Sequence, residues 1–176
     1  MNKKLLIIGA GGHGKVVAET ALQSGLWDIA GFCDDTIPAG TIVMDDITII
    51  SKLSGIENIS FDSFIVAIGN NQVRKDIFLK LITHFKAATI IHPFTHVSAH
   101  SSVEEGCIIL PGAVISFGVK IGANCIIGSN VHIDHESEIG AHCHIGNGTS
   151  IGSNCLIPSS YTTPTGLAIQ SFSHLS

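Results

Sequence analysis

The most constraining feature of this chain is a strict period of six residues. From Val97 to Ile157, every sixth residue is valine or isoleucine, and the series has no gap. Four residues after each of the first ten comes a small or medium-sized side chain, as at Ser101, Cys107 and Ala113. Neither an α-helix nor a simple strand produces this spacing. A hexapeptide repeat does, and it predicts a parallel β-helix in which three repeats complete one triangular coil.

In such a coil, the β-branched residue points inward and stacks on its equivalents, while the smaller residue fills the corner. We therefore expect the aliphatic series to be buried. The predicted β-helix domain covers residues 91–158, and His92-Pro93 marks its beginning, because proline suits the start of a strand. Thr163 and Ile169 keep the phase, but the texture decays, so residues 159–176 are expected to be irregular.

Residues 1–90 have a different texture and predict a separate domain. A short apolar run ends in a glycine-rich loop, a helical segment follows, and a second strand ends in two aspartates. Strand, glycine turn, helix, strand and acid are the opening of a doubly wound α/β fold. The expected strands are 3–8, 27–33 and 64–68, and the expected helices are 15–24 and 73–85.

The glycine-rich loop fits a nucleotide-binding turn. Gly9, Gly11 and Gly14 form a GxGxxG motif, in which the backbone approaches a phosphate and the helix N-terminus offers amide donors. Asp34 follows Gly14 by 20 residues, where a carboxylate can accept from ribose hydroxyls. The alternative is a tight turn with solvated aspartates. His13 is either a further donor beside the phosphate or an exposed loop histidine.

A second candidate ligand contact follows the third expected strand. Gly69-Asn70-Asn71 lies where α/β folds place ligands, and asparagine can recognise a base or ribose edge. The alternative is an ordinary turn.

The amino-acid composition limits the classes of partner that this protein is expected to bind. The net charge is -5 and there is no run of lysine or arginine, which argues against nucleic acid and anionic membranes. No signal peptide and no apolar run near the roughly 20 residues of a membrane span are found, so we expect a cytoplasmic protein. The five cysteines form no CxxC pair and four of them occupy the small-residue position, which favours buried thiols over disulfides or a metal site.

Histidines crowd the repeat region, but no pair shows the spacing of a metal site. His135-Glu136 breaks the glycine pattern directly after Ile133-Asp134. Histidine can act as a general base near neutral pH, and a neighbouring carboxylate can orient its ring. The alternative is a solvated histidine at a coil corner.

Taken together, IIGAGGHGKVVAE, CDD, AIGNNQVRK and HIDHESEIGAHCHIG resemble the NeuD-type sialic acid and sugar acyltransferases, which are similar to bacterial UDP-4-amino-sugar and GDP-perosamine N-acetyltransferases. The resemblance covers residues 1 to about 158. It implies a Rossmann-like sugar-nucleotide domain followed by a left-handed β-helix, and a homotrimer that uses acetyl-CoA as co-substrate.

The resemblance also implies roles for single residues. It places His135 as the general base, Glu136 as its support, and His144 as a second histidine near the substrate or thioester. The implied sugar-nucleotide contacts are Gly11, Gly12, His13, Asp34, Asp35, Gly69 and Asn70. Arg74 matches the motif without an implied role.

The resemblance ends at the last residues, since SFSHLS fits no repeat and family members continue with further coils. A truncated acetyl-CoA groove is therefore an expectation. Three functions follow from the sequence. The first is acetyl transfer to an amino or hydroxyl group of a nucleotide-linked or free sugar in surface glycan synthesis. The second is a nucleotide-dependent oxidoreductase, which rests on the glycine motif and Asp34 alone. The third is a catalytically impaired relic that binds nucleotide sugars as a trimer.

Overall fold

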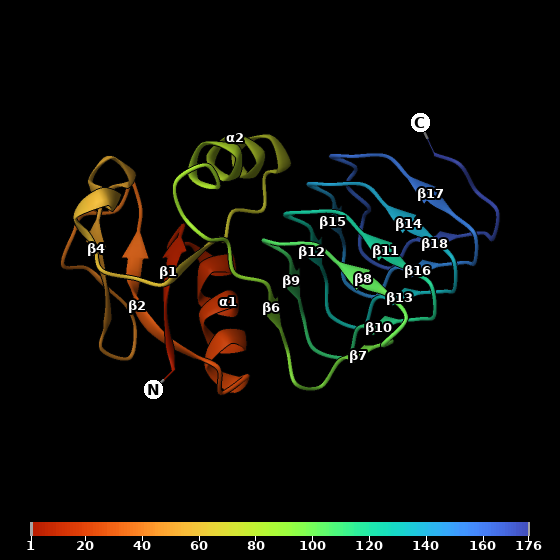
Figure 1. The fold of residues 1–176 in the computed structure, drawn as a ribbon, viewed down its shortest axis with the longest axis horizontal. Helices are drawn as coiled ribbons and strands as arrows, with labels where there is room; N and C mark the ends of the chain where they lie inside the picture. The colour runs from red at the N-terminus through yellow and green to blue at the C-terminus, as the bar shows by residue number, and fades with distance from the viewer. Residues whose placement is uncertain (1, 176) are drawn as a thin grey trace. The chain divides into compact units, whose positions relative to one another are not determined.

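A computed structural model of this protein describes residues 2–175, which form two compact units that divide between Ile90 and Ile91. Each unit has its own sheets and its own core. The first is an α/β unit, and the second is a left-handed parallel β-helix (Figure 1).

The α/β unit contains one five-stranded sheet with the order β3-β4-β2-β1-β5. All neighbouring strands pair in parallel except β3 and β4, which are antiparallel. Its elements are β1 (Lys3–Ile8), α1 (Gly12–Gln23), β2 (Trp27–Cys33), β3 (Ile42–Met44), β4 (Ile47–Ser51), the 3₁₀ helix η1 (Leu53–Asn58), β5 (Ser63–Val66) and α2 (Asn71–Leu81).

The first two strands have the bounds that the sequence predicts, whereas both helices begin earlier. Helix α1 begins at Gly12, not at residue 15, because the extended backbone of Gly11 already ends the loop. Helix α2 begins at Asn71, because the Asn70 side chain accepts a hydrogen bond from the Val73 backbone amide and caps the helix. Strands β3 and β4 and helix η1 were not predicted.

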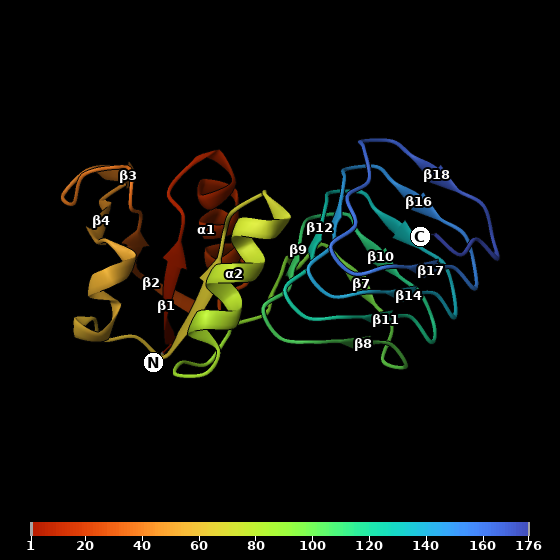
Figure 2. The same cartoon turned by 90° about the horizontal axis from the view of Figure 1, so that it is seen from above.

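The second unit is built from short strands on three parallel sheets. One sheet has the order β18-β16-β13-β10-β7, a second β17-β14-β11-β8, and a third β15-β12-β9-β6. Figure 2 shows the coils stacked along one axis. The strands are β6 (Ile90–Ile91), β7 (His96–Val97), β8 (Ser102–Val103), β9 (Ile108–Ile109), β10 (Val114–Ile115), β11 (Lys120–Ile121), β12 (Ile126–Ile127), β13 (His132–Ile133), β14 (Glu138–Ile139), β15 (His144–Ile145), β16 (Ser150–Ile151), β17 (Leu156–Ile157) and β18 (Ala168–Ile169).

The register shows that one coil takes three hexapeptides. Ile115 pairs with Val97 on one side and with Ile133 on the other, a step of 18 residues in each direction. The inward aliphatic residues from Ile109 onward are buried in one continuous core. Val97 and Val103 are only partly buried, because β7 and β8 end their sheets and are stacked on one side alone.

A second period of six appears at the corners of the coils. Every sixth residue from position 106 to position 172 has a positive φ. Glycine and asparagine fill eight of these positions, as expected for the left-handed region. The exceptions are Glu136, His142, Ser160 and Phe172.

The last segment differs from the irregular tail expected for residues 159–176. Strand β18 pairs with β16, and bridges join Thr162 to His144 and His174 to Leu156. The coil continues because Thr163 and Ile169 still point inward and are buried. The Thr163 hydroxyl also accepts a hydrogen bond from the Gly146 amide, which ties this coil to the previous one.

All five cysteines are buried free thiols, as the sequence predicts. Cys107, Cys125 and Cys143 stack at one corner, since the backbone amide of each later residue donates to the sulfur one coil before. The Cys125 and Cys143 thiols donate to the carbonyls of Gly140 and Pro158, both at 3.1 Å. These thiols therefore act as small core side chains that also satisfy backbone groups.

Candidate functional site

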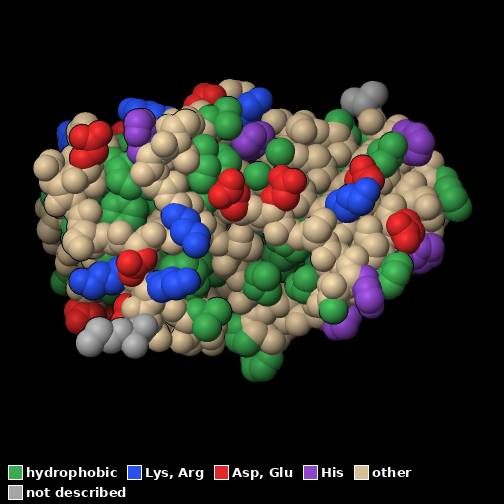
Figure 3. All heavy atoms as spheres, viewed as in Figure 1, with side chains coloured by type: hydrophobic (Ala, Val, Ile, Leu, Met, Phe, Trp, Pro, Cys, Tyr) green, Lys and Arg blue, Asp and Glu red, His purple; other side chains and the backbone are tan. Residues whose placement is uncertain are grey.

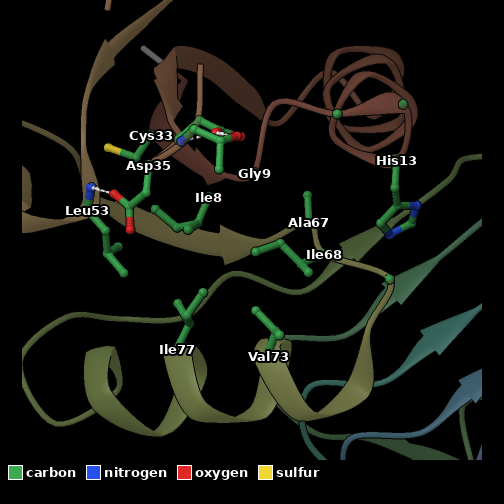
Figure 4. A pocket seen from close by; sticks show the side chains of 15 residues that line it. Ile8, Gly9, His13, Cys33, Asp35, Leu53, Ala67, Ile68, Val73 and Ile77 are labelled. Atoms are coloured by element: carbon green, nitrogen blue, oxygen red, sulfur yellow. Dashed lines mark hydrogen bonds between the residues drawn. The ribbon is translucent and has the colours of Figure 1, made fainter. Parts of the chain in front are cut away.

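The carboxyl ends of three neighbouring strands meet beside the glycine-rich loop. Ile8, the last residue of β1, pairs with Cys33 of β2 and with Val66 of β5. The segments that follow these strands surround a cavity of about 460 Å³. Its lining comes from the loop and first turn of α1, from β2 and the turn after it, from η1, and from the start of α2 (Figure 4). A cavity of this size at this edge of a parallel sheet is a typical ligand site.

Glycines open one wall of this cavity to the N-terminus of α1. Side chains at Gly11 or Gly12 would meet no atom within 4 Å, so both positions leave free space in front of the first helical amides. Gly14 is required for packing, because a Cβ there would collide with the carbonyl oxygen of Gly9. The amides of this first turn and the helix dipole favour an anion at this wall.

Asp34 organises the turn after β2. Its Oδ2 accepts from the Ala10 amide at 2.9 Å, and its Oδ1 accepts from the Thr36 amide, the Thr36 hydroxyl and the Ile37 amide. Burial acts to raise the pKa of Asp34, but these hydrogen bonds to its charged form outweigh burial and lower it. The carboxylate therefore joins the glycine loop to the following turn, while it also lines the cavity.

Asp35 is more exposed than Asp34 and has a single hydrogen bond. Its Oδ1 accepts from the Leu53 amide at 2.8 Å, which connects the turn to η1. Figure 4 shows Asp35 toward one end of the cavity and His13 toward the other. Beside Asp35, burial and the charge of this carboxylate raise the pKa of the Cys33 thiol to about 11. Cys33 is thus a neutral, apolar wall of the cavity at pH 7.

The segment after β5 is fixed from below by a buried arginine. Arg74 has no exposed surface, and its Nη1 donates to the carbonyls of Ile68 and Gly69 at 3.0 and 3.1 Å. Its Nη2 donates to Asn71 Oδ1 at 2.7 Å. Arg74 therefore shapes the loop whose residues Ile68 and Gly69 line the cavity. The sequence showed that Arg74 belongs to the motif but did not show this structural task.

Most, but not all, of the ligand contacts predicted from the sequence line this cavity. The structure brings together around one cavity Gly11, Gly12, His13, Asp34, Asp35 and Gly69. Asn70 is outside this lining, because its side chain caps α2. Residues that sequence reasoning missed are the apolar Leu53, Val73 and Ile77, which form much of the remaining wall. Leu53 gave no signal because η1 was not predicted, and the apolar character of Val73 and Ile77 fits the buried face of any helix.

The second candidate site is the corner between β13 and β14 of the β-helix. His135 and Glu136 are both exposed there, and Figure 3 shows several histidine side chains on the surface of this unit. Glu136 has φ +59°, so the backbone turns sharply directly after the histidine. Asp134 Oδ1 accepts from the His135 backbone amide at 2.8 Å. The corner presents the imidazole ring to solvent on a rigid coil.

The Glu136 side chain does not point as the sequence suggested. Within residues 2–175, no hydrogen bond joins its carboxylate to the His135 ring; instead the carboxylate lies over Gly118 of the preceding coil. His144 is half-buried in β15, on the side of the triangular coil opposite the corner that carries His135. Nine residues correspond to one and a half repeats, which is why the two histidines are separated.

Two further observations concern residues 2–175 as a whole. No group of three or more histidine, cysteine or acidic side chains there is arranged to hold a metal ion. No helix in the same part of the chain combines the length and the apolar character needed to cross a membrane.

Comparison with known proteins places a separate match on each unit. Residues 4–81 match the PglD N-terminal domain, and residues 118–153 match the bacterial transferase hexapeptide, six repeats. A curated relative, the UDP-N-acetylbacillosamine N-acetyltransferase of Bacillus subtilis (strain 168), is 32% identical over 116 residues, which are 61% of this chain. The chain spans about half of that relative's length, 51%.

Solved structures match nearly the whole chain. The acetyltransferase domain of PglB from Neisseria gonorrhoeae FA1090 is 29% identical with a TM-score of 0.75, over 97% of this chain and 86% of that one. The same domain in complex with acetyl coenzyme A gives a TM-score of 0.71 with the same identity and coverage. A perosamine N-acetyltransferase mutant from Caulobacter crescentus, in complex with CoA and GDP-perosamine, shares the fold at 24% identity and a TM-score of 0.78, over 98% of this chain and 88% of that one.

The oxidoreductase interpretation of the glycine motif is not supported by these matches. It would need a second nucleotide-binding half after the α/β unit, and a hexapeptide β-helix follows instead. The predicted resemblance to sugar acetyltransferases is confirmed: one segment of the chain matches the PglD N-terminal domain, and another matches the bacterial transferase hexapeptide.

Proposed function

We propose that this chain is an acetyl-CoA-dependent acetyltransferase that acts on an amino or hydroxyl group of a nucleotide-linked or free sugar in surface glycan biosynthesis. One observation carries the proposal. A cavity with an open helix N-terminus and an exposed carboxylate lies in a PglD-type unit, and the same chain carries a hexapeptide β-helix. The similar solved structures hold acetyl coenzyme A, or CoA together with GDP-perosamine.

The chemistry of the cavity fits a nucleoside diphosphate sugar, and we propose a UDP-sugar. The first amides of α1, exposed beside Gly11 and Gly12, would hold the phosphates. Asp35 has a free carboxylate oxygen for a hydroxyl or a ring N–H, because only its Oδ1 is engaged by Leu53. Asp34 would act mainly by holding the turn in shape.

On the β-helix, we propose His135 as the general base. Its imidazole would take a proton from the attacking amine or hydroxyl as that group adds to the thioester carbonyl of acetyl-CoA. A backbone amide of a coil would stabilise the oxyanion of the tetrahedral intermediate. When this intermediate collapses, the carbon–sulfur bond breaks, and the imidazolium passes its proton to the sulfur of the departing CoA. Glu136 and His144 are proposed to support this chemistry, Glu136 through the charge beside His135.

We also propose that the active form is a homotrimer in the cytoplasm, where acetyl-CoA and nucleotide sugars are found. Large apolar side chains of the β-helix unit support an interface, since Phe94, Phe117 and Phe172 are more than half exposed. Light scattering should give three times the 18.4 kDa of one chain. A monomer would contradict this part of the proposal.

The activity is tested by acetyl transfer from acetyl-CoA to a panel of UDP- and GDP-amino sugars, with the mass of the product as readout. His135→Ala should lower kcat by roughly 10²–10⁴-fold, the range for loss of a general base. The control is His132→Ala, an exposed histidine in the same coil, which should keep wild-type turnover. Equal rates for the two variants would remove His135 from the mechanism.

A non-catalytic trimer that only binds nucleotide sugars is the second candidate. It is favoured by one observation: the Glu136 carboxylate lies over Gly118 and makes no hydrogen bond with His135 within residues 2–175. Calorimetric binding of a UDP-sugar without turnover on any acceptor of the panel would support this candidate and reject the first.

A further inference from the structure

We propose that Gly118 is a positioning residue, which acts by providing the seat for the Glu136 carboxylate one coil further along the β-helix. The inference rests on the proposed function, in which Glu136 supports His135. It assigns a specific task to a glycine that the repeat pattern alone would explain as an ordinary turn residue.

The contact is close and involves the charged end of Glu136. A Cβ built on Gly118 would lie 2.7 Å from the Glu136 Cδ and 2.8 Å from each of its two carboxylate oxygens. The backbones of the two coils are joined here, because the Glu136 amide donates to the Phe117 carbonyl at 3.0 Å. The carboxylate therefore fills the space that any side chain at position 118 would occupy.

A side chain from the next coil also covers Gly112, where the Asn130 Oδ1 lies in the space of a Cβ, so packing alone does not distinguish Gly118. The difference lies in the charge of the group that packs on it. Gly118, Gly148 and Gly166 all have positive φ, at +71°, +67° and +72°. A Cβ at Gly148 would meet only the Gly166 Cα, at 4.0 Å, and one at Gly166 would meet nothing within 4 Å. All three corners have the backbone conformation that favours glycine, but of these three only Gly118 has a carboxylate packed on it.

The neighbouring side chains and the coil backbone also influence where the Glu136 carboxylate lies. Lys120, two residues after Gly118, donates to Glu138 Oε1 at 2.7 Å and also experiences the negative charge of Glu136. With Gly118 in place, the carboxylate is held against the coil, near the backbone corner that carries His135. A methyl group at position 118 would push it outward into solvent, where the coil no longer fixes its distance from the imidazole.

The experiment compares Gly118→Ala with Gly148→Ala, alone and in a Glu136→Ala background. Both glycine variants carry the same cost of an alanine at positive φ, so Gly148→Ala measures that cost by itself. Gly118→Ala should lower kcat roughly 10-fold or more below Gly148→Ala while KM stays nearly unchanged, because a positioning group acts in the transition state. In the Glu136→Ala background, the two glycine variants should have equal kcat.

Two results would overturn the inference. The first is equal kcat for the single variants, and the second is a loss at Gly118→Ala that persists in full without the Glu136 side chain. A crystal structure of Gly118→Ala separates this inference from the proposed function. If the wild type transfers no acetyl group, the proposed function fails, but a displaced Glu136 carboxylate still supports the seat and an unmoved one rejects it.

Discussion

The two units of this chain assign tasks to their polar residues in different ways. In the α/β unit, Asp34 and Asp35 are adjacent, yet one binds three backbone amides and a hydroxyl while the other binds a single amide and leaves an oxygen free. In the β-helix, paired strand residues repeat at a step of 18, as Val97, Ile115 and Ile133 do. A residue there becomes a candidate for a function when it departs from the usual corner residues, as Glu136 does above Gly118.

The two units should also differ in how far the effect of a single substitution spreads. The β-helix core is one continuous stack, so a single defect affects the coils on both sides. The polar tasks of the α/β unit depend on single contacts made between distant segments, such as Ala10 with Asp34. The predictions below test this contrast, from the largest expected effect to the smallest.

The largest effect should come from a charge placed inside the stack. Ile151→Asp puts a carboxylate where the side chain has no exposed surface, and an unpaired buried charge costs several kcal/mol. We expect no soluble folded protein, as judged by circular dichroism and light scattering. The matched control is Ser150→Asp in the same strand, whose side chain is exposed and whose melting temperature should change little. Similar behaviour of the two variants would break the inward and outward alternation of the coil.

The second effect concerns the buried arginine of the α/β unit. Arg74→Met keeps a long apolar stem but leaves the carbonyls of Ile68 and Gly69 without their guanidinium donor. The free energy of unfolding should fall by about 1–3 kcal/mol, and the affinity for a UDP-sugar should weaken with it, because the loop beside the cavity loses its shape. Denaturant titration and calorimetry measure the two effects.

The control for Arg74 is Lys80→Met, which removes a positive charge from an exposed position of the same helix. It should change neither quantity noticeably. An Arg74→Met variant that matches this control would show that the loop is held by other contacts.

The sequence predicts the repeating β-helix more completely than it predicts the single contacts of the α/β unit. The hexapeptide phase placed the inward residues correctly, because one geometric rule repeats in every coil. It underestimated only residues 159–175, where Thr163 keeps the phase with a side chain less apolar than the usual isoleucine. In the α/β unit, the bounds of β1 and β2 were predicted, since an apolar run between turn residues defines them.

The contacts of single residues in the α/β unit could not be predicted in this way. Asp34 and the Ala10 amide are 24 residues apart, and only the parallel pairing of β1 with β2 brings them together. For Asn70 the sequence left a ligand contact or an ordinary turn open, and it did not show that the Oδ1 of this side chain caps α2. The β-helix corner showed the opposite limit: the pair His135-Glu136 was visible, but the direction of the Glu136 carboxylate depended on Gly118.

The third prediction separates the two aspartates. Asp34→Asn should lower stability by about 1–3 kcal/mol, because an amide replaces a carboxylate whose two oxygens accept four hydrogen bonds. Asp35→Asn should leave stability nearly unchanged but weaken UDP-sugar binding. If Asp35→Asn binds as the wild type does, the free oxygen of Asp35 has no part in recognition.

The same carboxylate gives a pH dependence whose sign follows from its lowered pKa. Since the pKa of Asp34 is lower in the folded protein than its ordinary value of 3.8, its contribution to stability is present above that value. It is lost as the pH falls below 3.8 and through the folded pKa. Denaturation at pH 7 and at pH 3 should therefore show a smaller gap between wild type and Asp34→Asn at the lower pH. A gap that stays constant would mean that Asp34 acts without its charge.

The smallest effect concerns Cys33, which lines the cavity as a neutral thiol. Burial first, and then the charge of Asp35, raise its pKa to about 11, so iodoacetamide should scarcely modify it at pH 7. Modification should accelerate as the pH rises toward 11, and a saturating UDP-sugar should slow it, because Cys33 is part of the cavity wall.

Cys125 is the internal control: it is equally buried but belongs to the β-helix core, so the sugar nucleotide should not change its rate of modification. Mass spectrometry of the labelled peptides resolves the two sites. Rapid labelling of Cys33 at pH 7 would show that the cavity wall opens to solvent, and equal protection of both thiols by the ligand would show that the two units do not respond separately to binding.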